Sequence, residues 1–409
     1  MDRREFVAAT GAALVTAAGA RRPGVPVTPN LSFPPSVALQ EPTFSPGVFA
    51  ARIEKARAAV AAAKLDLLVA TPSTNYEYLT GYNPERSERL IALFLPVKGE
   101  PIIVCPAFEV ERLKQHSVPV NLRAWEEQGN PYDVVHDIAR DLKPPHRRGH
   151  AGLEPTTAYQ TLLKLDDAMD SWEFKSTDAL FRELRIVKAP EEVVMIRRAV
   201  AIIEDAIAAT FAQLAVGMTE RDVAATLSAE VAKRGSTGGG LVQFGTSSAL
   251  PHGGPAATPL AREMVVLIDA GARVAGYTSD ITRTIWWGDT PSDDFKKVFN
   301  TVHDAQTAAM QLGKPLVTHC QEMDRAARGL IATAGFGSFF THRLGHGLGM
   351  DGHEDPYLVE GNDTRLEPGM VFTIEPGIYQ LGKFGVRIED DCVMTDAGVE
   401  VLSRRPAKA

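Results

Sequence analysis

The stretch "MVVLIDAGARVAGYTSDITRTIWW" (residues 264–287) predicts a β-hairpin. An apolar run leads into Asp269, a glycine-containing turn follows, and the second run alternates in character around Asp280. Two such runs joined by a short turn are typical of paired antiparallel strands. The stretch therefore predicts a sheet that carries two carboxylates.

Two later stretches predict strands that carry one such acid each. In "MVFTIEPGIY" (370–379) the acid is Glu375, and in "FGVRIEDDCVM" (384–394) it is Glu389. A single acid in a strand is often only part of the solvated face. Here, however, an isoleucine immediately precedes Asp269, Glu375 and Glu389 within apolar runs, so these carboxylates are expected where water is scarce. Buried carboxylates must be protonated, paired or bound to metal.

A glycine-rich stretch, "HRLGHGLGMDGHEDP" (342–356), supplies histidines. The i, i+4 spacing of His342 and His346 would place both rings on one face of a helix. Three alternating glycines around His346 disfavour a helix, because each costs roughly 1 kcal/mol relative to alanine. An extended or looped backbone is expected instead, on which at most one of these histidines need be a ligand.

His346 and the four carboxylates together predict a metal site. Oxygen-rich ligation with a single nitrogen favours a hard or borderline divalent ion over a thiolate-bound structural zinc. Two divalent cations would offset the four negative charges, and paired cations are an arrangement used for hydrolysis. Two ions per chain are therefore expected. Mn(II) is favoured, and Co(II), Zn(II) or Fe(II) remain open.

The rest of the chain predicts two domains of mixed α/β character, of the α+β type. Residues 48–185 combine a helical pattern with apolar strand-like runs, and a second domain is expected over 186–409. It begins with a helix whose first turn holds Pro190, Glu191 and Glu192, a composition typical of helix N-termini.

The N-terminus predicts export. Arg3 and Arg4 precede an uncharged Ala/Gly-rich run that ends in a small-residue cleavage motif, so residues 1–20 resemble a twin-arginine signal peptide. An ordinary N-terminal helix is the competing interpretation. Residues 21–47 contain seven prolines and are interpreted as a linker. A periplasmic or secreted location is expected, without stable membrane insertion, because the apolar run is too short to span a bilayer.

Composition excludes some classes of partner. The 409 residues are 44% hydrophobic and carry a net charge of −8, which argues against a nucleic-acid or anionic-membrane partner. Three distant cysteines predict neither a zinc cluster nor a dense disulfide framework. A homodimer or higher homo-oligomer is expected.

The motifs "DAGARVAGYTSDITRT", "HRLGHGLGMDGHE", "TIEPGIY" and "GVRIEDD", in this order, resemble those of the pita-bread metallopeptidases. The resemblance is strongest to the Xaa-Pro aminopeptidase and Xaa-Pro dipeptidase (prolidase) branch. "YLTGYNPERSERLIALFLPVKGEP" resembles the creatinase-like N-terminal domain of that branch. The resemblance implies such a domain followed by a pita-bread catalytic domain with a curved, mainly antiparallel sheet.

The resemblance also implies roles for individual residues. Asp269 and Asp280 would bind one metal, His346 and Glu375 the other, and Asp280 and Glu389 would bridge the two. The positions that match the family's substrate site are His252, His342, His353, Tyr379 and Arg387.

Three of these residues have implied roles in the reaction. Glu375 would pass a proton from water to the leaving nitrogen, His353 would stabilise the oxyanion, and His252 would help to shape the proline pocket with His342. On a purely structural interpretation, His353 and His252 are only loop residues, and Arg387 is only a counter-charge to Asp390 or Asp391.

The sequence favours an exopeptidase that cleaves between an N-terminal residue and a following proline, an Xaa-Pro aminopeptidase. Its substrate would be a peptide with proline in second position. A dipeptidase would need a cationic or steric feature that closes the pocket on a free carboxylate, and the sequence assigns none. A metal-dependent lyase or hydrolase of a small zwitterion and a metal-free peptide-binding module on the same fold also remain open. Creatinases lack the complete ligand set, and methionine aminopeptidases generally lack the extra domain.

Overall fold

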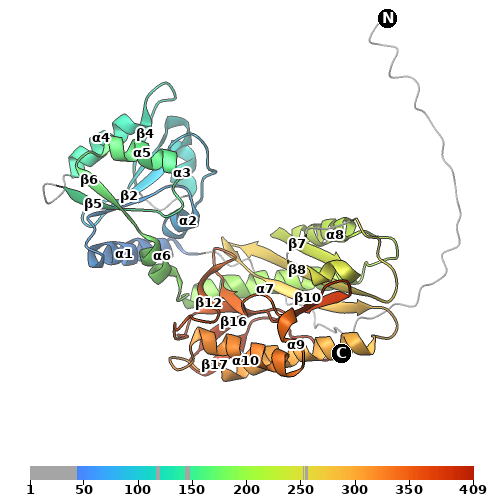
Figure 1. Cartoon of the computed structure of the whole chain (residues 1–409). Helices are drawn as coiled ribbons and strands as arrows, with labels where there is room; N and C mark the ends of the chain where they lie inside the picture. Colours follow the sequence, from blue (N-terminus) through green and yellow to red (C-terminus); the bar gives the residue numbers. More distant parts are fainter. Residues whose placement is uncertain (1–43, 117–119, 143–147, 252, 254–256) are drawn as a thin grey trace, which may run out of the picture.

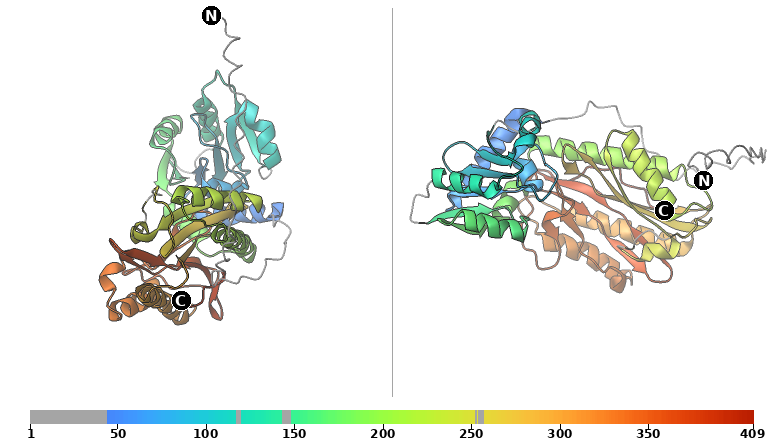
Figure 2. Two further views of the ribbon diagram at one scale, coloured as in Figure 1. Left: turned by 90° about the vertical axis from the view of Figure 1, so that its right-hand side faces the viewer. Right: turned by 90° about the horizontal axis from the view of Figure 1, so that it is seen from above.

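The computed structural model describes residues 44–116, 120–142, 148–251, 253 and 257–409. These residues form a smaller N-terminal domain at one end of a larger catalytic domain (Figures 1 and 2). The proposed signal peptide, residues 1–20, and most of the proposed linker lie outside the described residues. The first described helix begins at Pro46, within the range 21–47 interpreted as linker.

The N-terminal domain is built around a six-stranded mixed sheet with strand order β4-β3-β2-β1-β5-β6. The central strand β1 pairs antiparallel with β2 and parallel with β5. In chain order the elements are α1 (Pro46–Ala62), β1 (Leu67–Ala70), α2 (Thr74–Thr80), β2 (Ala92–Pro96), β3 (Ile102–Pro106), η1 (Ala107–Glu109), α3 (Val110–His116), β4 (Asn121–Trp125), α4 (Pro131–Leu142), β5 (Gly149–Leu153), α5 (Tyr159–Ala168), β6 (Trp172–Ser176) and α6 (Asp178–Arg185).

The catalytic domain contains antiparallel sheets of order β10-β8-β7, with β9 paired to β8, and β12-β11-β13-β16-β17, together with the ribbon β14-β15. Its elements are α7 (Pro190–Phe211), α8 (Glu220–Lys233), β7 (Thr237–Phe244), η2 (Gly245–Ala249), β8 (Met264–Val274), β9 (Tyr277–Thr278), β10 (Ile281–Trp287), α9 (Asp293–Leu312), α10 (Cys320–Thr333), η3 (Gly337–Phe339), β11 (Gly345–Gly347), β12 (Glu354–Leu358), β13 (Val371–Ile374), β14 (Gly377–Gln380), β15 (Phe384–Arg387), β16 (Asp390–Thr395) and β17 (Gly398–Val401). The predicted mainly antiparallel sheet is confirmed.

Local sequence signals set several of these elements. The hairpin turns at Ala275 and Gly276, both with positive φ, as a tight two-residue turn requires. Helix α7 begins at Pro190, and the Glu192 carboxylate accepts a hydrogen bond from the Ala189 N–H. Thr219 caps α8 by accepting from the N–H three residues later.

Helices cover the outer sides of the catalytic domain (Figure 1). Side chains of α7 and α8 share one apolar core with β7 and β8, and that core continues into the N-terminal domain. Helices α9 and α10 share a second core with β13 and β16. The sheets therefore lie between two helical layers, and the space between the sheets is left for polar side chains.

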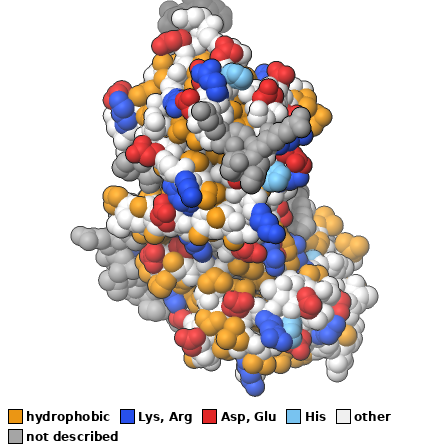
Figure 3. Space-filling view, turned by 90° about the vertical axis from the view of Figure 1, so that its left-hand side faces the viewer, with side chains coloured by type: hydrophobic (Ala, Val, Ile, Leu, Met, Phe, Trp, Pro, Cys, Tyr) orange, Lys and Arg blue, Asp and Glu red, His pale blue; other side chains and the backbone are white. Residues whose placement is uncertain are grey.

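The surface is mixed in charge. Basic and acidic side chains are interspersed over both domains on the face drawn in Figure 3. No helix among the described residues is long and apolar enough to cross a membrane. The cysteines Cys105, Cys320 and Cys392 are buried and free.

Two predicted strands are interrupted at their acids. Glu375 lies between β13 and β14, and Glu389 lies between β15 and β16, where the chain passes from one set of paired strands to another. The Glu375 N–H donates to the Leu344 carbonyl, and the Glu389 N–H donates to the Thr282 carbonyl. Because each acid leaves its own ladder at this point, its side chain is free to turn toward the space between the sheets.

Candidate metal centre

The histidine His346 is held on the short strand β11, between two glycines that other segments approach closely. A Cβ at Gly345 would lie 2.0 Å from the Thr373 carbonyl oxygen, and one at Gly347 would lie 2.2 Å from the Asp355 carbonyl oxygen. A helix is absent from this described stretch, as predicted. The alternating glycines instead allow neighbouring strands to pack against both sides of the His346 backbone.

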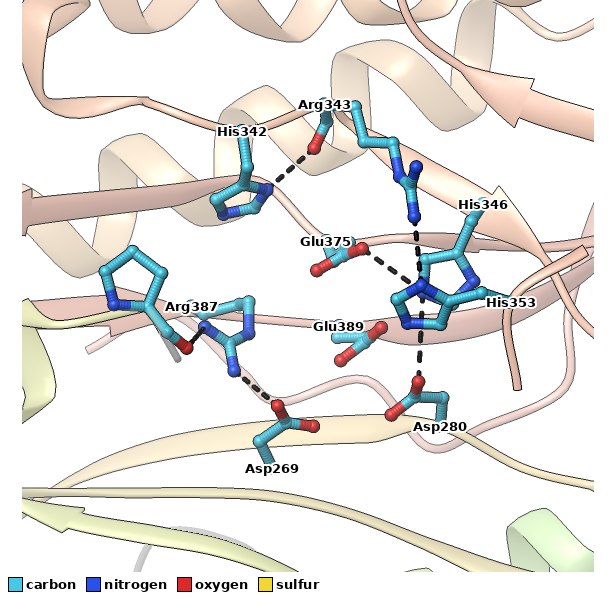
Figure 4. Close-up of a pocket in the computed structure, with 10 residues that line it drawn as sticks. Asp269, Asp280, His342, Arg343, His346, His353, Glu375, Arg387 and Glu389 are labelled. Atoms are coloured by element: carbon cyan, nitrogen blue, oxygen red, sulfur yellow. Dashed lines mark hydrogen bonds and ion pairs between the residues drawn. The ribbon is translucent and has the colours of Figure 1, made fainter. Parts of the chain in front are cut away.

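The acids converge on His346 from separate elements (Figure 4). Asp269 lies within β8, and Asp280 lies at the break between β9 and β10. The His346 Nε2 atom is 3.4 Å from a Glu375 oxygen and 3.8 Å from an Asp280 oxygen. These side chains and Glu389 line a cavity of about 490 Å³. The structure thus brings together all five residues predicted to bind metal.

The donor atoms fall into groups that would suit more than one ion. Asp269, Asp280 and Glu389 offer ligand atoms within 4.8 Å of one another, and so do His346, Glu375 and Glu389. Glu389 is common to both groups, which is the arrangement expected of a bridging carboxylate. Asp280, His346 and His353 form a third such group. The residues present therefore fit divalent cations.

Burial of the acids makes the metal-free site electrostatically unfavourable. Burial raises the pKa of Asp280 well above its usual value, and the neighbouring carboxylates, with Glu389 first among them, raise it further. Burial likewise raises the pKa of Glu375, and the pKa of Glu389 reaches about 8. Burial lowers the pKa of His346 to about 3, so its ring is neutral and suited to metal coordination.

These pKa values predict that metal-free protein loses stability as the pH rises. Between its usual pKa of 4.5 and about 8, Glu389 keeps a proton in the folded state that the unfolded state has released. The free energy of unfolding then falls by about 1.4 kcal/mol per pH unit for each such carboxyl. His346, whose pKa is lowered from 6.5, opposes this trend only below pH 6.5.

We therefore expect the Tm of chelator-treated protein to fall between pH 6.5 and 8. The fall should be smaller in Glu389→Gln and in metal-loaded protein. A Tm of the metal-free protein that stays constant or rises across this interval would contradict the assignment of raised carboxyl pKa values.

Arg387 is ion-paired inside the site. Its guanidinium donates to Asp269 Oδ2 at 2.6 Å, to Thr282 Oγ1 at 3.0 Å and to the Tyr379 hydroxyl at 2.9 Å. The partner of this arginine is therefore Asp269, whereas the purely structural interpretation had paired it with Asp390 or Asp391. Thr282 also donates to Glu389 at 2.6 Å, so one hydroxyl connects the arginine to the carboxylate shared by both donor groups.

The predicted substrate residues that are described lie near these acids. His342 Nε2 is 2.8 Å from the Tyr379 hydroxyl, and burial raises the pKa of Tyr379 to about 12, so this tyrosine stays protonated. The His353 ring stacks on the His346 ring with a centroid distance of 3.8 Å. His252 lies outside the described residues, and its predicted role stays a prediction.

Sequence reasoning missed Arg343. It lies beside His342 in the quoted glycine-rich stretch and lines the same cavity, with its guanidinium 3.0 Å from His353 Nδ1 (Figure 4). An arginine within a histidine- and glycine-rich motif has no characteristic spacing. Its position in the chain, next to a cavity-lining histidine and three residues before His346, was the one available signal.

Comparisons with known proteins agree with this geometry. The model of metallopeptidase family M24 matches residues 194–396, and the creatinase/prolidase N-terminal domain model matches residues 52–187. The "Probable dipeptidase PepE" of Mycobacterium tuberculosis is 37% identical over 375 residues, which cover 89% of this chain and 96% of that protein.

Two solved structures are similar along most of the chain. A prolidase from Thermococcus sibiricus has a TM-score of 0.82 at 31% identity and covers 90% of this chain and 99% of its own. Dipeptidase PepE from Mycobacterium ulcerans has a TM-score of 0.80 at 36% identity and covers 89% of this chain and 97% of its own. These relatives support a dipeptidase better than the aminopeptidase that the sequence analysis favoured.

The predicted twin-arginine export and periplasmic or secreted location are wrong. The relatives that align with most of the chain are named as dipeptidases, and they give no support for export. The prediction depended on residues 1–20, which lie outside the described part of the chain, and a pair of arginines before an alanine-rich run is a weak signal.

The family is metal-dependent, and its prolidase and dipeptidase members hydrolyse peptides. The family models, the relatives and the cluster of five donor residues all lead to one assignment. The chain therefore belongs to metallopeptidase family M24, with a creatinase-type N-terminal domain, and is a peptide hydrolase.

Proposed function

We propose that this protein is a dipeptidase that hydrolyses Xaa-Pro dipeptides with the help of two divalent metal ions. The observation that carries the proposal is the guanidinium of Arg343 in the wall of the cavity. The dipeptidases and prolidases among its relatives support it. Peptides longer than two residues would then be poor substrates, in contrast to the aminopeptidase interpretation.

Arg343 has the properties of a carboxylate-binding group. Its guanidinium lies over the Tyr357 ring, 4.4 Å from the ring centroid, and contacts the His353 imidazole. Within the described residues, no carboxylate forms an ion pair with it. The α-carboxylate of a dipeptide would supply such a partner, and arginine binds carboxylates through two parallel hydrogen bonds. This is the cationic feature that a dipeptidase requires.

The metal ions would be held by the five clustered donors, with Asp280 and Glu389 bridging and Mn(II) favoured for its preference for oxygen ligands. When bound, the ions supply a water that is acidic near neutral pH and polarise the scissile carbonyl. Arg387 would shift only slightly away from Asp269 when metal binds, because Thr282 and Tyr379 also hold its guanidinium. Its positive charge would then offset part of the negative charge of the carboxylates.

The protein's own residues would handle the proton and the developing charge. Glu375 lines the cavity, where it would accept the proton of the attacking water and pass it to the proline nitrogen, which leaves poorly unless protonated. His353 lies at the cavity wall, where it would stabilise the charge on the carbonyl oxygen. The pair of His342 and Tyr379 would border the proline ring.

The domain limits 48–185 and 186–409 and the homo-oligomer stay predictions.

The preference for dipeptides can be tested with Ala-Pro and Ala-Pro-Ala. We expect kcat/KM for the tripeptide to be more than a hundredfold below that for the dipeptide. Arg343→Met should lower kcat/KM for Ala-Pro by roughly 10- to 100-fold, the effect of losing one hydrogen-bonded charge pair, and should leave the low tripeptide value nearly unchanged. Arg325→Met is the matched control, because it removes an exposed ion pair between Arg325 on α10 and Glu360.

Equal cleavage of the two peptides would make this protein an aminopeptidase. Loss of activity on both peptides by the same factor in Arg343→Met would remove the arginine from carboxylate recognition. Comparable cleavage of Ala-Ala would contradict the proposed requirement for proline.

A further inference from the structure

We propose that Arg185 is a positioning residue, which docks the N-terminal domain against the loop of residues 350–355 and thereby holds His353 in the catalytic cavity. We call these six residues the His353 loop. The inference rests on the proposed role of His353 in the reaction. It assigns to the N-terminal domain an indirect part in catalysis, through the position of His353.

The acids on both sides of His353 bind residues of the N-terminal domain and of its connection to α7. Asp351 accepts hydrogen bonds from Thr74 Oγ1 at 2.6 Å and from Arg185 at 2.8 Å. Glu354 accepts from the same Arg185 nitrogen and forms an ion pair of 2.7 Å with Lys188. Helices α2 and α6 and the connection to α7 therefore hold the His353 loop.

A second arginine of α6 extends this contact. Arg182 Nε lies 3.2 Å from Asp355 Oδ1. With this pair, every acidic residue of the loop binds the N-terminal domain or its connection to α7. Helix α6 and strand β12, which starts inside the loop, meet at the junction of the two domains in Figure 1. The loop thus belongs to the catalytic domain by sequence and to the domain interface by its contacts.

Arg185 is fixed from its own side. Its other guanidinium nitrogen donates to Asn75 Oδ1 at 2.7 Å, and the Asn75 amide donates to Glu154 at 2.9 Å. The side chain of Arg185 is 11% exposed, and that of Glu354 is 12% exposed, so water screens their ion pair little. Because the guanidinium is planar and rigid and is bound on both sides, it can fix the position of the carboxylates that it binds.

The placement of His353 follows from these anchors. One Arg185 nitrogen bonds to carboxylates on both sides of the histidine, and the loop is too short to shift one side alone. Without the arginine, the negative charges of Asp351 and Glu354 would face each other, because both carboxylates pair with the same Arg185 nitrogen. We expect the loop to open and the His353 ring to leave its stack on His346.

A double-mutant cycle on kcat for Ala-Pro tests this coupling. Arg185→Ala should lower kcat by tenfold or more, with KM changed less than kcat and metal content unchanged. In His353→Ala the further change Arg185→Ala should lower kcat by less than twofold, because the group that it positions is already gone. Arg185→Lys should restore part of the loss.

A second readout does not depend on activity. The His353 ring signal can be assigned in metal-free, 13C-histidine-labelled protein by its absence in His353→Ala. We expect this signal to shift in Arg185→Ala, because the ring leaves its neighbour. If Arg185→Ala fails to fold, Asp351→Asn offers a milder test with the same expected direction, since it removes one charge from the loop and leaves the arginine in place.

Arg52 provides a matched control. It also joins the two domains from a buried position, through Glu192 at 3.0 Å and Tyr277 at 2.8 Å, and within the described structure no hydrogen bond or ion pair connects it to the His353 loop. Arg52→Ala should lower Tm and leave kcat within about twofold and the His353 signal in place.

Three results would overturn the proposal. The first is a double variant of Arg185 and His353 whose fall in kcat equals the product of the falls in the two single variants. The second is an unshifted His353 signal in a folded Arg185→Ala variant. The third is an Arg52→Ala variant that reproduces both effects, because general loosening of the domains would then explain them. If wild-type protein cleaves Ala-Pro-Ala as well as Ala-Pro, the dipeptidase proposal fails, but the cycle can be measured on that substrate.

Discussion

Asp280→Asn and Glu389→Gln are expected to lose most bound metal and nearly all peptidase activity while keeping their fold. Each substitution removes one negative charge from between the two proposed ions, which would then repel each other with less compensation. Glu389 belongs to both donor groups, so its loss affects both ions. The fold should survive because both carboxyls are costly to bury as charges in metal-free protein.

Elemental analysis of the purified variants gives the metal content, and circular dichroism checks the fold. Glu360→Gln, which removes a charge at the exposed ion pair with Arg325, is the control and should keep full metal and activity. Two metal ions per chain in either site variant would show that the bridging positions are wrongly assigned.

His353→Ala should keep its metal and lose turnover by roughly 10²- to 10³-fold, the effect of removing one group that stabilises the transition state. The imidazole lies in the cavity wall and stacks on His346. KM should change less than kcat, because the charge that His353 meets develops during the reaction.

The third donor group makes the metal measurement decisive for this variant. Asp280, His346 and His353 also lie within ligand distance of one another. If His353→Ala lost one ion together with its activity, the histidine would be a ligand. Unchanged turnover would instead make it a loop residue without a part in the reaction.

The architecture could be predicted because its signals are local. The hairpin depends on a turn and on alternation within 24 neighbouring residues, and its two acids follow from the apolar runs around them. The glycines beside His346 disfavoured a helix, and close approach of Thr373 and Asp355 explains them. In each case the physical cause lies within a short segment of chain.

The interruptions at Glu375 and Glu389 could not be predicted in the same way. Both acids stand inside continuous apolar runs, and only the pairing of the flanking strands with different partners shows where the chain changes sheet. Pro376, which lacks an N–H for the ladder, was the one local sign of a break.

The contacts that distinguish this site join distant residues. Arg185 and Glu354 are 169 positions apart, and Arg387 and Asp269 are 118 positions apart. A single sequence contains no signal for such pairs. The relatives support the dipeptidase alternative better than the favoured aminopeptidase interpretation. The cation proposed to bind a free carboxylate is recognisable only once Arg343 is seen in the cavity with His353.

The central claim is that five residues of the catalytic domain hold two metal ions. Anomalous diffraction from crystals of the manganese-loaded protein, collected on both sides of the manganese edge, tests it most directly. The account predicts two peaks about 3.5 to 4 Å apart, between Asp269, Asp280, His346, Glu375 and Glu389, with Glu389 touching both. A single peak, or two peaks outside this cluster, would contradict it.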